Sequence, residues 1–162
     1  MTHFTLEELQ HQIQTKPEQW RPLVLTNGCF DLLHIGHVRY LQTAKSLGKT
    51  LVVGLNRDES VRSIKPQKTN FPPRPIIPEQ QRAEVLSALA AVDAVVLFSE
   101  TTAESLIEAL RPDIYAKGGD YTLATLPEAK TVQRYGGTIQ FIAVEVSTST
   151  SDIIRKITKL SR

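Results

Sequence analysis

The sequence has little of several features that would narrow its function at once. It contains a single cysteine, Cys29, so an internal disulfide and a zinc site built from several thiolates are both excluded. Aromatic residues make up 6% of the chain and no run of lysines and arginines occurs, which argues against nucleic acid as a partner. No apolar stretch approaches the length of a membrane span, and the polar first residues lack the apolar stretch expected of a signal peptide. We therefore expect a cytoplasmic protein without a membrane partner.

The overall composition is that of a globular protein of modest size. The 162 residues are 41% hydrophobic and 22% charged, and their formal net charge is +2. This length predicts one domain over residues 1–162, with a lead-in over 1–20 and a core over 21–162. The mildly basic charge is compatible with small anionic substrates.

Strand-like and helix-like segments alternate along the chain. Continuous apolar runs, typical of buried parallel strands, are expected at residues 23–26, 50–55, 94–98, 114–116 and 138–144. Helices are expected in the lead-in before residue 17, at residues 37–47, in a short segment after 56, and at 78–91, 102–110, 126–135 and 150–160. The alternation predicts an α/β fold, a Rossmann-like three-layer α/β/α arrangement around a five-stranded, mainly parallel sheet.

Two histidines stand where the first strand turns into a helix. His34 and His37 are three residues apart, so they lie on one face of the first helical turn. The unpaired peptide N–H groups there attract anions, and imidazoles can donate hydrogen bonds to charge that develops on a phosphate. The alternative is that both rings only cap and pack the turn.

The segment around these histidines resembles the signature of the cytidylyltransferase-like nucleotidyltransferases, G-x-F-D-x-x-H-x-G-H. The matching positions are Gly28, Phe30, Asp31, His34, Gly36 and His37. Ser149, Thr150 and Ser151 resemble the second signature of this family, I-S-T-T, with Thr148 in place of isoleucine and Ser151 in place of the last threonine. Hydroxyls at a helix start usually cap it, but at the ligand edge of a sheet they also suit the β- and γ-phosphates of a nucleotide.

Four further segments look like one branch of this family, the heptose 1-phosphate adenylyltransferases, which occur alone or fused to a sugar kinase. These segments are residues 56–58, 74–76, 117–121 and 149–151. The resemblance implies that a sugar 1-phosphate attacks the α-phosphorus of ATP, which gives an ADP-sugar and pyrophosphate, with Mg²⁺ on the phosphates. One departure is Pro66, where this branch usually has glycine. A separate sugar kinase and a homodimer are possible partnerships.

The resemblance also implies a set of site residues. The implied catalytic residues are His34, His37, Lys65 and Arg82. The nucleotide would contact both histidines and also Gly28, Cys29, Phe30, Lys117, Gly118, Asp120, Ser149, Thr150 and Ser151. The acceptor sugar phosphate would contact Asp31, Asn56 and Lys65, and no protein side chain is expected to bind a metal directly. The proline-rich residues 66–78 are long for a loop and are expected to act as a lid.

Two other functions remain open at this point. The first is a glycerol- or alditol-phosphate cytidylyltransferase that uses CTP; the absence of arginine at residues 144–146 argues against it. The second is a catalytically silent nucleotide-binding or sensor domain, against which the intact His34, His37, Lys65 and Ser149 argue.

Overall fold

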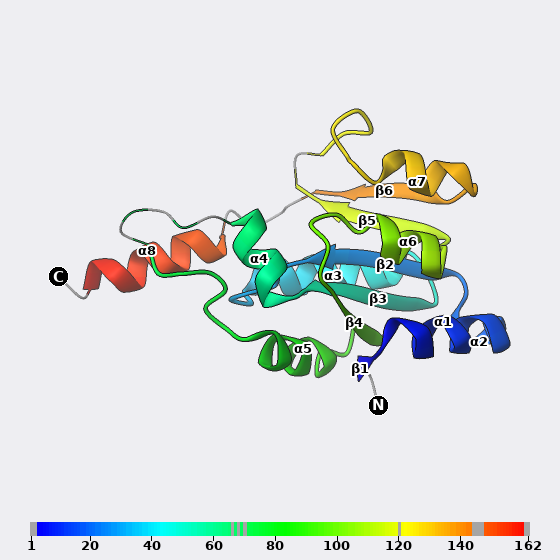
Figure 1. Ribbon diagram of the computed structural model, residues 1–162, viewed down its shortest axis with the longest axis horizontal. Helices are drawn as coiled ribbons and strands as arrows, with labels where there is room; N and C mark the ends of the chain where they lie inside the picture. The colour runs from blue at the N-terminus through cyan, green and yellow to red at the C-terminus, as the bar shows by residue number, and fades with distance from the viewer. Residues whose placement is uncertain are drawn as a thin grey trace.

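The chain folds around a parallel sheet of six strands, in a computed structural model that describes residues 3–65, 67, 69, 71–119, 121–143 and 148–160 (Figure 1). The strands are β1 (His3–Phe4), β2 (Leu23–Gly28), β3 (Thr50–Asn56), β4 (Ala94–Phe98), β5 (Ile114–Gly118) and β6 (Thr138–Ile142). Their order is β1-β4-β3-β2-β5-β6, and every pairing is parallel.

The sheet has one strand more than the five that the sequence predicts. The additional strand is β1, in which His3 and Phe4 pair with Val95 and Val96 of β4. Two residues are too few to show an apolar run, so the prediction of five strands was wrong for a local reason. The other five strands lie where they were expected, because β2 and β3 in particular are buried apolar runs.

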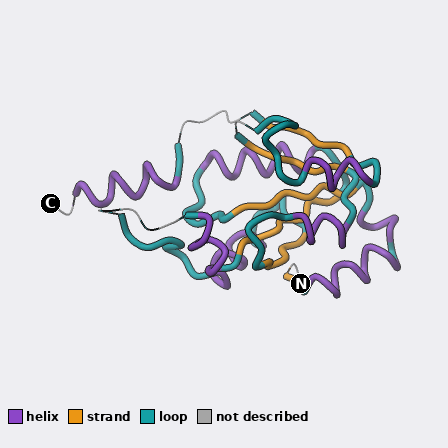
Figure 2. Tube along the Cα trace, turned by 45° about the horizontal axis from the view of Figure 1, so that its top comes forward, coloured by secondary structure: helices purple, strands orange, loops and turns teal. Residues whose placement is uncertain are grey.

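Helices pack on both faces of the sheet. They are α1 (Leu6–Thr15), α2 (Pro17–Trp20), α3 (Ile35–Ser46), α4 (Asp58–Ile64), α5 (Glu79–Ser87), α6 (Glu104–Leu110), α7 (Ala129–Arg134) and α8 (Thr150–Leu160). One apolar cluster joins α1, α2, α6 and α7 to one face, and a second joins α3 and α5 to the other. The three-layer prediction is confirmed, and Figure 2 shows helices on both sides of the strands.

Local sequence explains the helix starts. Thr5 accepts a hydrogen bond from the backbone N–H of Glu8, whose carboxylate accepts one from the backbone of Thr5, which completes a capping box at α1. The leading helix α1 ends at Thr15, near Pro17 as the sequence predicts, and Pro17 then opens the short helix α2, because proline is well tolerated in a first turn. Among the described helices none is long and apolar enough to cross a membrane.

The order of the strands places the ligand-binding edge. From β2 the chain moves outward through β3 and β4, and then returns to β5 on the other side of β2. The sheet therefore has its switch point between β2 and β5, and ligands of such sheets bind beyond the carboxyl ends of the strands at this point. The last helix, α8, lies beyond this edge, near α4 (Figure 1).

Candidate active site

A cavity of about 560 Å³ opens at the switch point, beyond the ends of β2, β3 and β5. We call it the main cavity. Most residues that the sequence predicted for the site line it, namely Gly28, Cys29, Phe30, Asp31, His34, His37, Asn56, Lys65, Lys117, Gly118, Ser149, Thr150 and Ser151. Arg82 is not in this lining, and Asp120 lies outside the described residues. The structure thus brings together segments that are more than a hundred residues apart in the sequence.

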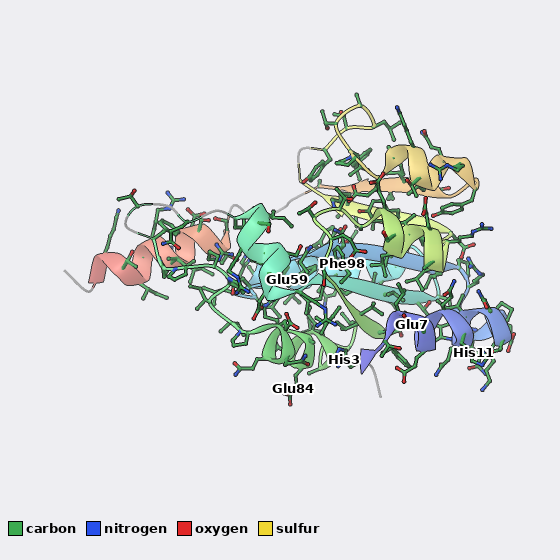
Figure 3. The ribbon with its side chains drawn as sticks, viewed as in Figure 1. His3, Glu7, His11, Glu59, Glu84 and Phe98 are labelled. Atoms are coloured by element: carbon green, nitrogen blue, oxygen red, sulfur yellow. The ribbon has the colours of Figure 1, made fainter. Side chains whose placement is uncertain are left out.

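The turn after β2 presents both histidines to the main cavity. His34 is the N-cap of α3, and its Nδ1 accepts a hydrogen bond of 3.2 Å from the backbone N–H of Gly36. In a neutral ring the proton is then on Nε2, which is free of this bond and can donate. A Cβ atom at Gly36 would lie 3.0 Å from the His34 ring, so glycine permits the ring to fold back over the turn. The other two histidines, His3 and His11, lie on β1 and α1, outside the lining of the cavity (Figure 3).

Burial disfavours the charged form of both imidazoles of the turn. It lowers the pKa of His34, and it lowers the pKa of His37 to about 4, where the neighbouring charge of a protonated His34 adds to the effect. Phe30 covers His37 with a ring-centroid distance of 5.4 Å. Nδ1 of His37 is buried and has no hydrogen-bond partner among the described residues. At neutral pH the pair therefore offers N–H groups and not positive charges.

Asp31 holds a loop beside the histidines. Its carboxylate accepts hydrogen bonds from the guanidinium of Arg74 and from the backbone N–H groups of Ile76 (2.8 Å) and Ile77 (2.9 Å). The Asp31 side chain is fully buried. These bonds give Asp31 a loop-holding position in the lining of the cavity, and the sugar-phosphate contact expected of it stays a prediction.

Two cationic side chains reach the main cavity from this same side. Lys65, at the C-terminal end of α4, lines the cavity and is exposed. Arg74 also lines it, with 12% of its side chain exposed. Sequence reasoning did not assign Arg74 to the site, although the segment 74–76 had been noted as similar to the adenylyltransferase branch.

Arg82, for which a direct phosphate contact is predicted, lies outside the lining of the main cavity. Its guanidinium is completely buried and donates to the carbonyl oxygens of Ile77 (2.8 Å), Cys29 (2.6 Å) and Asn56 (2.9 Å), and to the carboxylate of Asp58 (2.6 Å). These bonds join the ends of β2 and β3 to the start of α4. Arg82 is therefore a positioning residue that fixes the floor of the site from beneath.

A buried polar cluster forms the opposite wall. Nζ of Lys117 donates to Oδ1 of Asn27 (2.9 Å), which also accepts from the hydroxyl of Tyr115 (2.6 Å). Burial lowers the pKa of Lys117, and the nearby carboxylate of Glu128, 4.0 Å away, opposes this shift. Asn27 and Glu128 line the cavity, but sequence reasoning missed both, because their role depends on contacts between distant segments.

The hydroxyl residues at the start of α8 (Ser149, Thr150 and Ser151) line the cavity beside the histidine turn. The backbone oxygen of Thr148 would lie 3.8 Å from a Cβ at Gly36, which places this segment beside the start of α3. Ser149 and Asp152 exchange hydrogen bonds as in a helix cap, with Oγ to Oδ2 at 2.6 Å. Thr150 donates to the carbonyl of Leu32 (3.2 Å). Ser149 thus caps α8 while it also lines the main cavity.

Cys29 is not set up as a nucleophile. Burial raises the pKa of its thiol, although Lys65, Arg82 and Arg74 act in the opposite direction. The thiolate is the reactive form of cysteine, so a raised pKa leaves Cys29 as a polarisable lining group.

Known proteins are similar to this chain over most of its length. The family model described as cytidylyltransferase-like matches residues 25–158. The bifunctional protein HldE of Syntrophotalea carbinolica is 47% identical over 151 residues, which cover 93% of this chain and 30% of that protein. The chain spans about 30% of the length of the curated relatives that it matches first.

Solved structures agree on the fold. The lipopolysaccharide core biosynthesis protein from Thermoplasma volcanium has a TM-score of 0.61 and 30% identity, with coverage of 77% of this chain and 97% of that one. The pantoate-beta-alanine ligase from Francisella tularensis has a TM-score of 0.61 at 14% identity and covers 100% of this chain and 80% of its own. At that identity the second similarity supports the fold alone.

Proposed function

The chain belongs to the cytidylyltransferase-like family of nucleotidyltransferases, and from this premise we propose that it transfers AMP from ATP to a sugar 1-phosphate. The observation that carries the proposal is the pair of neutral imidazoles at a helix start, with Lys65 and Lys117 on the flanks of the same cavity. Neutral N–H donors and flanking cations suit a phosphate chain whose charge shifts during transfer.

In the proposed reaction an oxygen of the sugar phosphate attacks the α-phosphorus of ATP. A new P–O bond forms, the bond between the α-phosphorus and the bridging oxygen breaks, and pyrophosphate leaves with its electron pair. The attacking phosphate is already ionised, so no side chain has to remove a proton. His34 and His37 would donate hydrogen bonds to the transferred group, while Lys65 would offset the charge of the acceptor. The protein contributes positioning and charge stabilisation.

Mg²⁺ fits this reaction as an ion bound to the nucleotide. Among the described residues no group of three or more His, Cys, Asp or Glu side chains could hold a metal ion. Asp31, the acidic residue nearest the histidines in sequence, has its oxygens engaged by Arg74 and by the loop. Mg²⁺ prefers phosphate oxygens and water to such a site, so the substrate phosphates would hold it and it would neutralise their charge.

We propose D-glycero-D-manno-heptose 1-phosphate as the acceptor, with ADP-heptose as the product. The segment from Lys117 to Tyr121 and the absence of arginine at residues 144–146 both resemble the heptose adenylyltransferase branch. The description of the Thermoplasma volcanium relative as a lipopolysaccharide core biosynthesis protein supports an activated sugar as product. A sugar kinase, on the same or a separate chain, would supply the acceptor phosphate. A cytoplasmic location and a homodimer remain predictions.

Pyrophosphate release tests the proposal. The purified protein is offered ATP or CTP, each with heptose 1-phosphate or glycerol 3-phosphate. We expect ATP with heptose 1-phosphate to be best by on the order of 10³-fold in kcat/KM, since a mismatched base leaves polar groups unpaired. The His37→Asn variant controls for a contaminating enzyme. Faster turnover of CTP with glycerol 3-phosphate would assign the cytidylyltransferase alternative, and no release with any pair would favour the silent sensor domain.

A further inference from the structure

Glu128 has an unpaired carboxylate oxygen in the wall of the main cavity. The residue precedes α7 and is only 3% exposed. Its Oε1 accepts a hydrogen bond from the backbone N–H of Ala103 (3.1 Å). Its Oε2 is buried and has no hydrogen-bond partner among the described residues. Such an oxygen is costly, because it has lost its hydration without gaining a donor, and each case in a native structure calls for an explanation.

The donors nearest to this carboxylate are engaged elsewhere. Lys117 Nζ lies 4.0 Å from Oε1 and donates to Asn27. Burial, and next the charge of this carboxylate, raise the pKa of the Tyr115 hydroxyl, but its one proton is donated to Asn27, at 2.6 Å. Thr102, which lines the same wall, donates to Glu104. Asn27 thus collects two donors, and Oε2 of Glu128 is left for a group that enters the cavity.

The surroundings define the chemistry of that group. The carboxylate repels an anion, so a phosphate does not fit against it. A metal ion does not fit either, because the neighbouring charge is the ammonium of Lys117 and the described residues supply no acidic cluster. A neutral donor such as a sugar hydroxyl would satisfy the oxygen without adding charge, in a charge-assisted hydrogen bond.

We propose that Oε2 of Glu128 accepts a hydrogen bond from a hydroxyl group of a bound substrate, and that Glu128 is a specificity-determining residue. The inference rests on the proposed function, since both substrates of that reaction carry hydroxyls: the ribose of ATP and the acceptor sugar. The backbone N–H of Ala103 holds the other carboxylate oxygen of Glu128, so a substrate without the hydroxyl leaves Oε2 buried and unpaired.

The test compares Glu128→Gln with the wild type and with Glu104→Gln. The glutamine keeps an oxygen for the Ala103 N–H but removes the charge from the other end. Glu104 is an exposed carboxylate on α6, outside the lining of the cavity, and serves as the matched control. Calorimetry measures the affinity for ATP, for 2′-deoxy-ATP and 3′-deoxy-ATP, and for heptose 1-phosphate, and pyrophosphate release gives KM for each substrate.

We expect Glu128→Gln to lower the affinity for one substrate by about 10-fold or more, as for loss of a hydrogen bond to a charged group. Glu104→Gln should leave all affinities unchanged. If Glu128 binds the ribose, the wild type will bind one deoxy-ATP more weakly than ATP by a similar factor. The variant will bind that deoxy-ATP and ATP with nearly the same affinity. If the acceptor is bound, only the affinity for heptose 1-phosphate will fall.

Equal affinities for wild type and variant with every ligand would overturn the proposal. A uniform weakening with a lowered Tm would also overturn it, because it would place the role of Glu128 in the contact with Ala103. These outcomes are separate from failure of the proposed function. That failure would appear as a wild type that binds ATP but releases no pyrophosphate with heptose 1-phosphate, and the ATP and deoxy-ATP affinities would still report on Glu128.

Discussion

The imidazole rings of His34 and His37 lie with their centroids 4.0 Å apart and their planes inclined at 35°. A proton on one ring would place a positive charge directly beside the other, and burial already disfavours the charged form. The closeness of the two rings therefore favours a neutral pair of donors over an imidazolium. This distinguishes the site from one that uses histidine as a cation or as a proton shuttle near neutral pH.

The first prediction concerns pH. The pKa values of His34 and His37 are both lowered, that of His37 to about 4, so kcat/KM should show no step at the ordinary histidine value of 6.5 and should fall at lower pH as the rings become protonated, with His37 protonated near pH 4. The free energy of unfolding should also depend on the protonation of His37. An unfolded chain protonates His37 near its ordinary value of 6.5, so the free energy of unfolding falls as the pH drops from about 6.5 toward 4.

Denaturant unfolding of the wild type and of His37→Asn across this range measures the effect. The variant should lose part of the acid sensitivity between about pH 6.5 and 4, whereas His11→Asn, on the exposed side of α1, should keep it. A rate profile with a clear step near pH 6.5 would contradict the assignment of a neutral pair.

The second prediction concerns catalysis. His34→Ala and His37→Ala should each lower kcat by about 10²-fold or more, typical of losing a donor to the transition state. His34→Ala should also cost about 1 kcal/mol of stability, because it removes the cap of α3. His11→Ala serves as the control. Near-normal turnover of both site variants, measured as pyrophosphate release, would indicate that the histidines only cap and pack the turn.

Local signals were sufficient for most of the fold and for the outline of the site. The apolar runs that became β2 and β3, and the spacing of His34 and His37, depend on neighbours in the sequence. The direction in which a side chain points does not depend on such neighbours alone. Arg82 matched a family position but turns beneath the cavity, because the carbonyl ends of two strands meet there only after folding.

Residues that act through distant partners could not be found in this way. Glu128 looks like a surface carboxylate in the sequence, and its burial follows from contact with Ala103, 25 residues earlier. Asp31 matched the first signature, but its partners Ile76 and Ile77 come from a loop 45 and 46 residues later. Spacing along one segment carries no information about such pairs.

The third prediction concerns the loop that Asp31 holds. Arg74→Met removes the ion pair but keeps a long side chain, so the backbone N–H groups of Ile76 and Ile77 should exchange hydrogen faster in the variant. Nucleotide and sugar phosphate together should slow exchange in residues 71–78 of the wild type, as expected of a lid. The control is Arg134→Met, which breaks an exposed ion pair with Glu108. Exchange that neither the variant nor the ligands change would refute the lid.

The fourth prediction separates positioning from contact at Arg82. Arg82→Met would leave the buried carbonyl of Asn56, the carbonyl of Cys29 and the partly exposed carboxylate of Asp58 without their donor. A buried acceptor left without its donor costs about 1–3 kcal/mol, so denaturant unfolding should show a clear loss of stability. Arg82→Lys should recover part of it, because an ammonium can reach some of these oxygens but cannot match the planar fork of the guanidinium. A direct phosphate contact predicts the reverse pattern: stability close to that of the wild type, with kcat lowered by about 10²-fold or more. Measuring the free energy of unfolding and kcat on the same preparations decides between the two, because the buried bonds act on folding and a phosphate contact acts on turnover.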